Sequence, residues 1–156
     1  MKLPAGITGF YDLKNNQPPN VDGKQFKQVC STLVNRSGGK VLEFKEPQYP
    51  MNFYDIEVKA FNKHFHILLN EHYPYLAFAS VVEFGKINFI DVPELKQFRS
   101  LYKVLSVREL NEPLVLNPNS KEGILQNEND LNSAELEQVA YWKPKRIGEV
   151  IFNYWD

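Results

Sequence analysis

All three histidines of this chain lie between residues 64 and 72, and their spacing fits metal chemistry better than any other set of side chains does. His64 and His66 are separated by one residue. Alternate side chains of a β-strand point to the same face, so a His-x-His pair can chelate zinc or another divalent ion. A third ligand is needed, and Glu57, Asp55 and His72 are near enough in the sequence to be considered. A metal-dependent enzyme is therefore one interpretation of this segment.

The same segment also has an explanation without a metal. The apolar residues that alternate with the histidines predict the buried face of a strand, which leaves His64 and His66 on the solvent-exposed face. These apolar residues are Phe65, Ile67 and Leu69. We favour a solvated strand face over a metal site, and we expect His72 in a loop. No catalytic residue, metal ligand or cofactor follows from this interpretation.

The connection to the preceding strand-like segment limits how the histidines can pair. The link "FNKH" is too short for anything except an antiparallel hairpin. A turn centred on residues 61 and 62 would set His66 opposite Glu57, and a turn one residue later would set it opposite Lys59. The sequence leaves both registers open.

Other catalytic motifs are weak or missing from the sequence. The stretch "SGGK" lacks the spacing of a phosphate-binding P-loop, and there is no Gly-x-Ser-x-Gly motif. Cys30 falls within the apolar stripe of a predicted helix, where a buried structural thiol is favoured over a nucleophile. The sequence therefore predicts a protein that is not an enzyme.

Three predicted helix starts carry a capping-box spacing, in which a polar residue precedes Gln or Glu by three positions. The pairs are Asp22 with Gln25, Asp91 with Glu94, and Asn132 with Glu135. The first pair should begin a helix from about Gly23 to Ser37, because the apolar residues there share one helical face. These residues are Phe26, Val29, Cys30, Leu33 and Val34.

Alternating segments predict an antiparallel sheet. They are "KVLEFKE", "NFYDIEVKA", "HFHILL", "PYLAFASVV" and "KINFID", with "YKVLSV" as a further candidate. The segment "PYLAFASVV" is apolar on both faces, as expected of a central strand that is covered on each side. The sequence thus predicts an α+β fold, with a mostly antiparallel sheet of about five strands and three or four helices packed on it.

Composition excludes several classes of protein. The 156 residues fit a single domain, 1–156. With 18 basic and 19 acidic residues, the chain lacks the basic surplus of a nucleic-acid binder. No apolar run approaches the ~20 residues of a membrane span, and the start has no apolar region typical of a signal peptide. A single cysteine suits a reducing compartment, so we expect a cytoplasmic protein.

Residues 111–130 form a long segment that is rich in asparagine and interrupted by proline and glycine. Loops of this length are often binding or mobile elements. With the helix that follows, this segment forms the most acidic stretch of the sequence: Glu122, Glu128, Asp130, Glu135 and Glu137. One interpretation is a solvated loop that enters a helix whose N-terminal end favours acidic residues. The other is an acidic surface offered to a basic partner.

Aromatic residues gather near the C-terminus, in "AYWKPKRIGEVIFNYWD". Pro144 should end the third helix, and we favour a fourth helix over a strand for the residues after it. One face of that helix would carry Ile147, Val150, Ile151 and Tyr154. Phe152 and Trp155 do not fit on this face, so they either pack elsewhere in the core or meet a partner. Trp155 therefore joins the acidic residues as a predicted partner contact.

The short chain, the Asn-rich acidic loop and the end "YWKPKRIGEVIFNYWD" resemble small bacterial immunity-type proteins that accompany secreted toxins. The resemblance covers about the last quarter of the chain and its general layout. It implies a non-enzymatic cytoplasmic protein that binds a partner toxin and blocks it. The resemblance itself assigns no binding residue.

Overall fold

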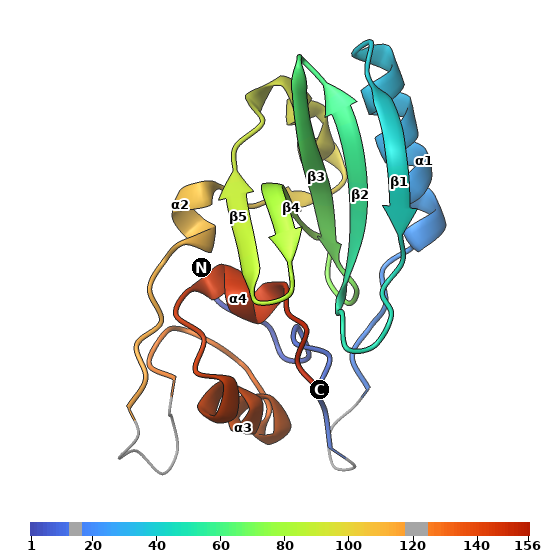
Figure 1. The fold of residues 1–156 in the computed structure, drawn as a ribbon. Coiled ribbons are helices and arrows are strands. Elements are labelled where there is room, and N and C mark those ends of the chain that lie inside the picture. Colours follow the sequence, from blue (N-terminus) through green and yellow to red (C-terminus); the bar gives the residue numbers. More distant parts are fainter. Residues whose placement is uncertain (13–16, 118–124) are drawn as a thin grey trace.

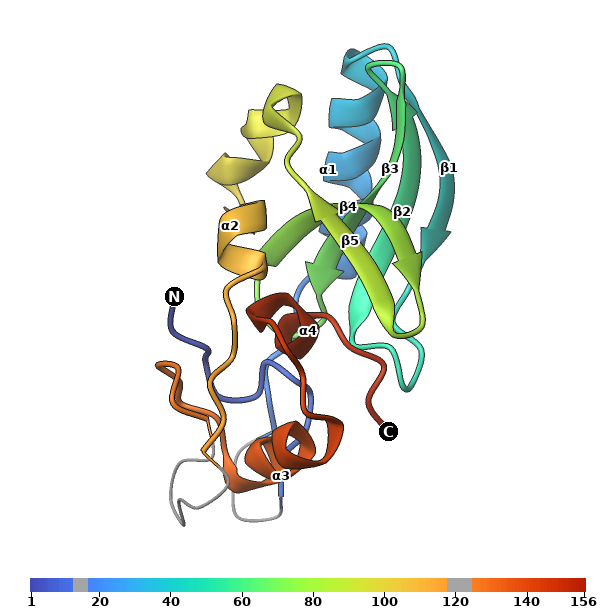
Figure 2. The ribbon, with the colours of Figure 1, turned by 60° about the vertical axis from the view of Figure 1, so that its left-hand side comes forward.

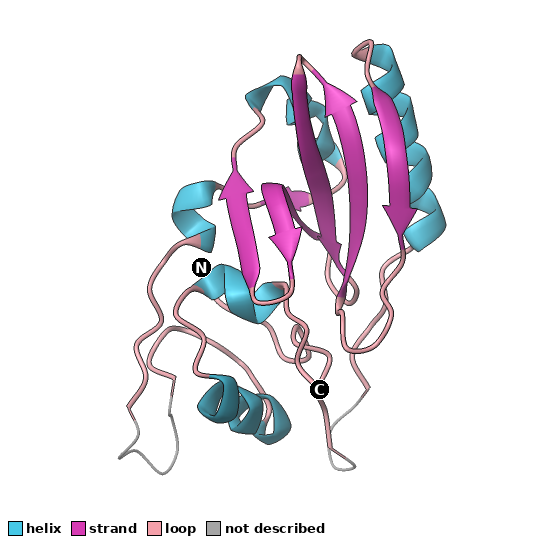
Figure 3. Cartoon of the chain, in the orientation of Figure 1, coloured by secondary structure: helices cyan, strands magenta, loops and turns pink. Residues whose placement is uncertain are grey.

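The computed structural model describes residues 1–12, 17–117 and 125–156, and its fold is α+β, as predicted (Figures 1 and 3). An antiparallel sheet runs in the order β1-β2-β3-β4-β5, and the short β6 pairs in parallel with β4. The strands are β1 (Lys40–Lys45), β2 (Phe53–Ala60), β3 (Lys63–Asn70), β4 (Tyr75–Glu83), β5 (Lys86–Ile90) and β6 (Lys103–Val104). The helices are α1 (Gly23–Arg36), the 3-10 helix η1 (Pro93–Ser100), α2 (Val107–Leu110), α3 (Ser133–Trp142) and α4 (Ile147–Ile151).

One face of the sheet packs against α1 and η1, and we call this layer the α1-side core. From α1, the side chains of Phe26, Cys30 and Val34 are fully buried in it, which confirms the predicted apolar stripe. Burial raises the pKa of the Cys30 thiol, because a thiolate is poorly stabilised in an apolar environment. Cys30 is therefore a structural residue, as expected.

The opposite face carries a second layer, the C-terminal-side core, built from the N-terminal segment, α3, α4 and the end of the chain. Figure 2 shows α4 against the lower part of the sheet, with α3 beyond it. The central strand β4 contributes to both layers: Leu76 and Phe78 point into the α1-side core, and Ala77 and Ala79 into the other. This arrangement confirms the prediction of a strand that is covered on each side.

A helix begins after each of the three predicted capping-box sequences, and two of the three have the predicted side-chain cap. The side chain of Asp22 accepts a hydrogen bond from the backbone N–H of Gln25 at the start of α1. Asn132 and Glu135 form the complete reciprocal pair at the start of α3. A helix also follows Asp91, but it is the 3-10 helix η1, which begins with Pro93, and the predicted side-chain cap is wrong because no side chain caps it. The Asp91 carboxylate instead accepts from the backbone N–H of Val107, at the start of α2.

The C-terminal segment forms a helix rather than a strand, as favoured. Ile147, Val150 and Ile151 of α4 are fully buried in the C-terminal-side core. The helix ends before Phe152, whose backbone is extended, so the prediction that Tyr154 shares the helical face is wrong. Among the described helices, none combines the length and apolar character needed to cross a membrane.

Candidate functional site

The hairpin that carries the histidines has the first of the two registers left open by the sequence. Its turn is centred on Phe61 and Asn62, which both have positive φ, and His66 lies opposite Glu57. Phe65, Ile67 and Leu69, which were predicted to lie on the buried face of the strand, are fully buried in the α1-side core. Alternate residues of β3 therefore point to opposite faces of the sheet, with the apolar ones buried, as the sequence indicated.

Each imidazole on the other face of β3 is bonded to a carboxylate of β2. His64 Nε2 lies 2.6 Å from an oxygen of Glu57, and His66 Nδ1 lies 2.8 Å from an oxygen of Asp55. Within residues 1–12, 17–117 and 125–156, no group of three or more His, Cys, Asp or Glu side chains could hold a metal ion. The described residues thus form two separate pairs, whereas a zinc site on His64, His66 and Glu57 would need three converging ligands.

The face that holds these pairs is solvated only toward the β2–β3 turn. His64 is exposed, whereas Asp55 is only 4% exposed and Leu68 and Asn70 are fully buried. The prediction of a solvated strand face is wrong at this end, because the C-terminal-side core covers it. His72 lies outside the strands, as expected, and its Nδ1 is 2.8 Å from the carbonyl oxygen of Pro19.

The acidic residues predicted to contact a partner occupy different environments. Glu122 lies outside the described residues. Glu128, Asp130 and Glu137 are exposed, and Asp130 is paired with Lys2 at 3.2 Å. For these three carboxylates, contact with a partner stays a prediction.

Glu135 is fully buried and is bonded to the N-terminal segment. Its carboxylate accepts from the backbone N–H groups of Gly6 (2.6 Å) and Thr8 (2.9 Å) and from the Thr8 hydroxyl (2.5 Å). In this structure Glu135 therefore attaches the N-terminal segment to α3, and its side chain is not part of an acidic surface.

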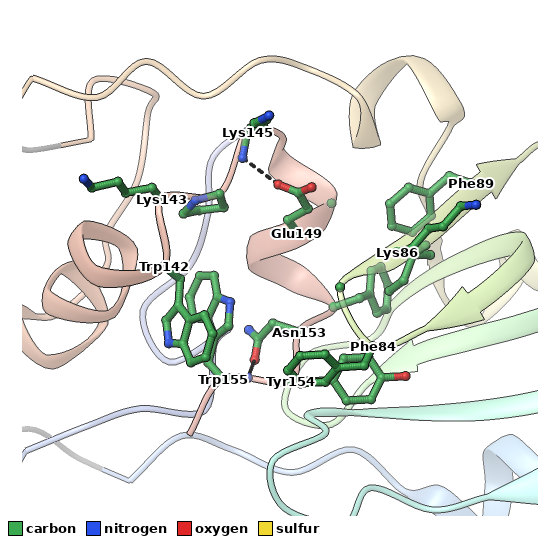
Figure 4. Close-up of a pocket in the computed structure, with 15 residues that line it drawn as sticks. Phe84, Lys86, Phe89, Trp142, Lys143, Lys145, Glu149, Asn153, Tyr154 and Trp155 are labelled. Atoms are coloured by element: carbon green, nitrogen blue, oxygen red, sulfur yellow. Dashed lines mark hydrogen bonds between the residues drawn. The ribbon is translucent and has the colours of Figure 1, made fainter.

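A pocket lies between the β4–β5 hairpin and the segment from α3 to the chain end. Its volume is about 350 Å³, within the range of ~300–1,000 Å³ typical of ligand sites. We call it the aromatic pocket. Its lining includes the rings of Phe84, Phe89, Trp142, Phe152, Tyr154 and Trp155 (Figure 4).

The rings of this pocket pack on one another in pairs. Trp142 and Trp155 are stacked with centroids 6.5 Å apart and an interplanar angle of 4°. Phe84, at the β4–β5 turn, packs against Tyr154 with centroids 5.5 Å apart. Figure 4 shows the two pairs along one side of the pocket. Trp155 is 7% exposed, so it contributes a ring face to the pocket rather than a freely exposed side chain.

Two close contacts bring α4 against the hairpin. A Cβ added at Gly148 would lie 2.4 Å from Phe89 Cε2, so only glycine allows this approach. The guanidinium of Arg146 lies over the Phe89 ring at 5.3 Å and donates to the carbonyl oxygen of Ile87 at 3.0 Å. These contacts hold one wall of the pocket in place.

Buried asparagines hold the other wall. The Asn52 side chain donates to the carbonyl oxygen of Ile151 and accepts from the backbone N–H of Asn153. Asn70 also donates to Ile151, at 2.8 Å, and the Asn153 side chain accepts from the backbone N–H of Trp155 at 3.1 Å. The chain end is therefore attached to Asn52, directly before β2, and to Asn70 at the end of β3 by satisfied hydrogen bonds, which makes the pocket a preformed feature.

Basic residues surround the mouth of the pocket. Lys86, Lys143 and Lys145 line it and are exposed, and their side chains have no ion-pair partner in the described part of the chain. Glu149 is the one carboxylate in the lining, and it accepts from the backbone N–H groups of Lys145 (2.5 Å) and Arg146 (3.3 Å). The pocket thus combines ring faces with a surplus of positive charge.

The sequence indicated only part of this pocket. The excess of C-terminal aromatic residues pointed to Trp155, but Phe84 was not among the candidates, and Lys86 was placed only at the start of the predicted strand "KINFID". The available signal was the phenylalanine itself, because a large apolar residue in a turn has no core to enter. Its exposed fraction is 70%.

No protein-family model, curated protein or solved structure matches this chain in the comparisons made with each.

Proposed function

We propose that this protein is a non-enzymatic protein-binding module, and that it acts as an immunity protein that neutralises a cognate bacterial toxin in the cytoplasm. The partner docks on the aromatic pocket and its rim. One observation carries the proposal: the exposed Phe84 lines a preformed pocket that contains both tryptophans of the chain, and the exposed Tyr141 packs on one of them, Trp142.

Exposed aromatic residues around a pocket are typical of the centre of a protein interface. A few Trp, Tyr and Arg side chains usually supply most of the binding energy there, because they bury large apolar area with few rotatable bonds. Phe84 and Tyr141 are 70% and 76% exposed. Both rings rest on other rings, Phe84 on Tyr154 and Tyr141 on Trp142. Their positions are therefore held before a partner arrives, which reduces the entropy lost on binding.

The proposal predicts a toxin gene beside the gene of this protein, and co-expression with that toxin tests this function. The protein should protect the cell and form a stoichiometric complex with the toxin. Phe84→Ser should abolish protection and weaken the complex at least tenfold, because burying a phenylalanine ring contributes roughly 1.5–3 kcal/mol. The matched control is Leu101→Ser, at an exposed residue beside η1 that does not line the pocket.

The control variant should protect as well as the wild type does. Absence of both protection and a complex would refute the proposed function. A complex that tolerates Phe84→Ser would show that the partner docks elsewhere on the molecule.

A further inference from the structure

The charges at the aromatic pocket indicate what its occupant carries. Three lysines at the rim, Lys86, Lys143 and Lys145, are exposed and unpaired in the described chain. The negative charge of Glu149 is balanced by Arg146, whose Nε lies 3.6 Å from the Glu149 carboxylate, so the three lysines leave a positive surplus for an incoming group. In Figure 4 the lysine side chains extend outward from the lining in different directions. They can therefore reach carboxylates on both sides of an inserted group.

The floor of the pocket favours a ring. Phe89, Trp142 and Trp155 line it, and the volume of about 350 Å³ exceeds what one small aliphatic side chain would fill. Aromatic side chains pack on one another through offset or edge contacts that add to simple burial. An aromatic side chain from the partner would extend the packing already present between Trp142 and Trp155.

We infer that the occupant of the aromatic pocket is an acidic segment of the partner protein that inserts an aromatic side chain between the two tryptophans and the β4–β5 hairpin. This inference rests on the proposed function and adds the chemistry of the partner. The acidic residues Glu128, Asp130 and Glu137 of this chain, which suggested a basic partner, do not line the pocket. The basic pocket therefore favours an acidic partner surface, whereas the acidic stretch suggested a basic one.

A designed peptide tests this chemistry without knowledge of the natural partner. The probe is a capped heptapeptide with a central phenylalanine and three glutamates on each side. It contains no tryptophan, and both tryptophans of the protein line the pocket, so the intrinsic tryptophan fluorescence reports binding directly. We expect saturable binding that weakens as the salt concentration rises, because exposed charges are screened.

Two changes separate the contributions of ring and charge. A peptide with alanine in place of phenylalanine should bind at least tenfold more weakly. The triple variant Lys86→Glu, Lys143→Glu, Lys145→Glu should also lose at least tenfold. Its matched control, with the same change of net charge, replaces Lys24, Lys40 and Lys96 by glutamate. These three residues are exposed and lie outside the pocket lining. The control should keep wild-type affinity.

Equal binding by the alanine peptide, equal loss in the two triple variants, or no fluorescence change at all would overturn the inference. The outcomes for the two proposals are distinguishable. If Phe84→Ser disrupts a toxin complex that tolerates the pocket triple variant, the function stands and the acidic occupant is refuted. If the peptide binds as expected while no toxin is neutralised, the pocket chemistry stands and the immunity function is refuted.

Discussion

Replacing the buried carboxylate of Glu135 should loosen the attachment of the N-terminal segment to the rest of the fold. One carboxylate oxygen accepts from the backbone N–H groups of Gly6 (2.6 Å) and Asn132 (3.2 Å). The other accepts from the Thr8 N–H (2.9 Å) and the Thr8 hydroxyl (2.5 Å). In Glu135→Gln one oxygen becomes an amide NH₂, which cannot accept a hydrogen bond. At least one buried N–H group then loses its acceptor.

The magnitude follows from these contacts. A buried donor without a partner costs about 1–3 kcal/mol, and bonds to a charged acceptor are roughly twice as strong as neutral ones. Loss of one acceptor and weakening of the remaining bonds should therefore reduce the free energy of unfolding by about 3 kcal/mol. This is a large part of the ~5–15 kcal/mol typical of a folded domain, yet it leaves the protein folded at room temperature.

Urea unfolding followed by tryptophan fluorescence measures this loss. Glu137→Gln is the matched control, since Glu137 lies on the same helix and is exposed. The control should change the free energy of unfolding by less than about 0.5 kcal/mol. Limited proteolysis should cut Glu135→Gln within its first residues before the wild type is cut. A loss below about 1 kcal/mol, or equal effects of the two substitutions, would refute the role assigned to Glu135.

Four further predictions concern other parts of the fold. Tyr102→Phe should raise the free energy of unfolding by about 1 kcal/mol, because the buried Tyr102 hydroxyl has no hydrogen-bond partner in the described structure. Burial also raises the pKa of Tyr102 to about 12. Above pH 10 the unfolded chain therefore releases this proton more readily than the folded chain does, so the free energy of unfolding of the wild type should fall as the pH rises. In urea titrations at pH 8 and 11, Tyr102→Phe should show a smaller fall than the wild type. Gly148→Ala should destabilise by about 2 kcal/mol or more and change the tryptophan emission, because the new Cβ overlaps the Phe89 ring. A thiol reagent should label Cys30 only at the rate of unfolding, since burial raises the thiol pKa; fast native-state labelling would contradict this.

Much of the local structure was predictable because it depends on neighbours along the chain. The caps at Asp22 and Asn132 involve residues three positions apart, and the alternation in β3 follows from backbone geometry alone. The failed cap at Asp91 shows the limit of such rules. Pro93 starts a 3-10 helix there, and the carboxylate bonds to Val107, sixteen residues further along the chain.

Burial was the property that local patterns could not decide. Glu135 looked like an exposed helix-start acid, and only the return of the N-terminal segment, with Gly6 lying 129 positions away, turned it into a buried acceptor. Asp55 alternates with apolar residues as a solvated side chain does, yet the C-terminal-side core covers it. Whether a polar face meets water depends on which distant segment packs over it.

The sequence by itself determined the apolar face of α1, the buried face of β3, the central position of β4 and the class of the fold. It did so because hydrophobic periodicity encodes the face that each element buries. Only the tertiary structure decided where the aromatic pocket lies. Phe84 and Trp155 belong to segments far apart in the chain, and the bonds of Asn52 and Asn70 to Ile151 attach the C-terminal segment to the sheet that carries the β4–β5 hairpin. The pocket is formed by segments that lie far apart in the sequence, so no local sequence pattern can specify it.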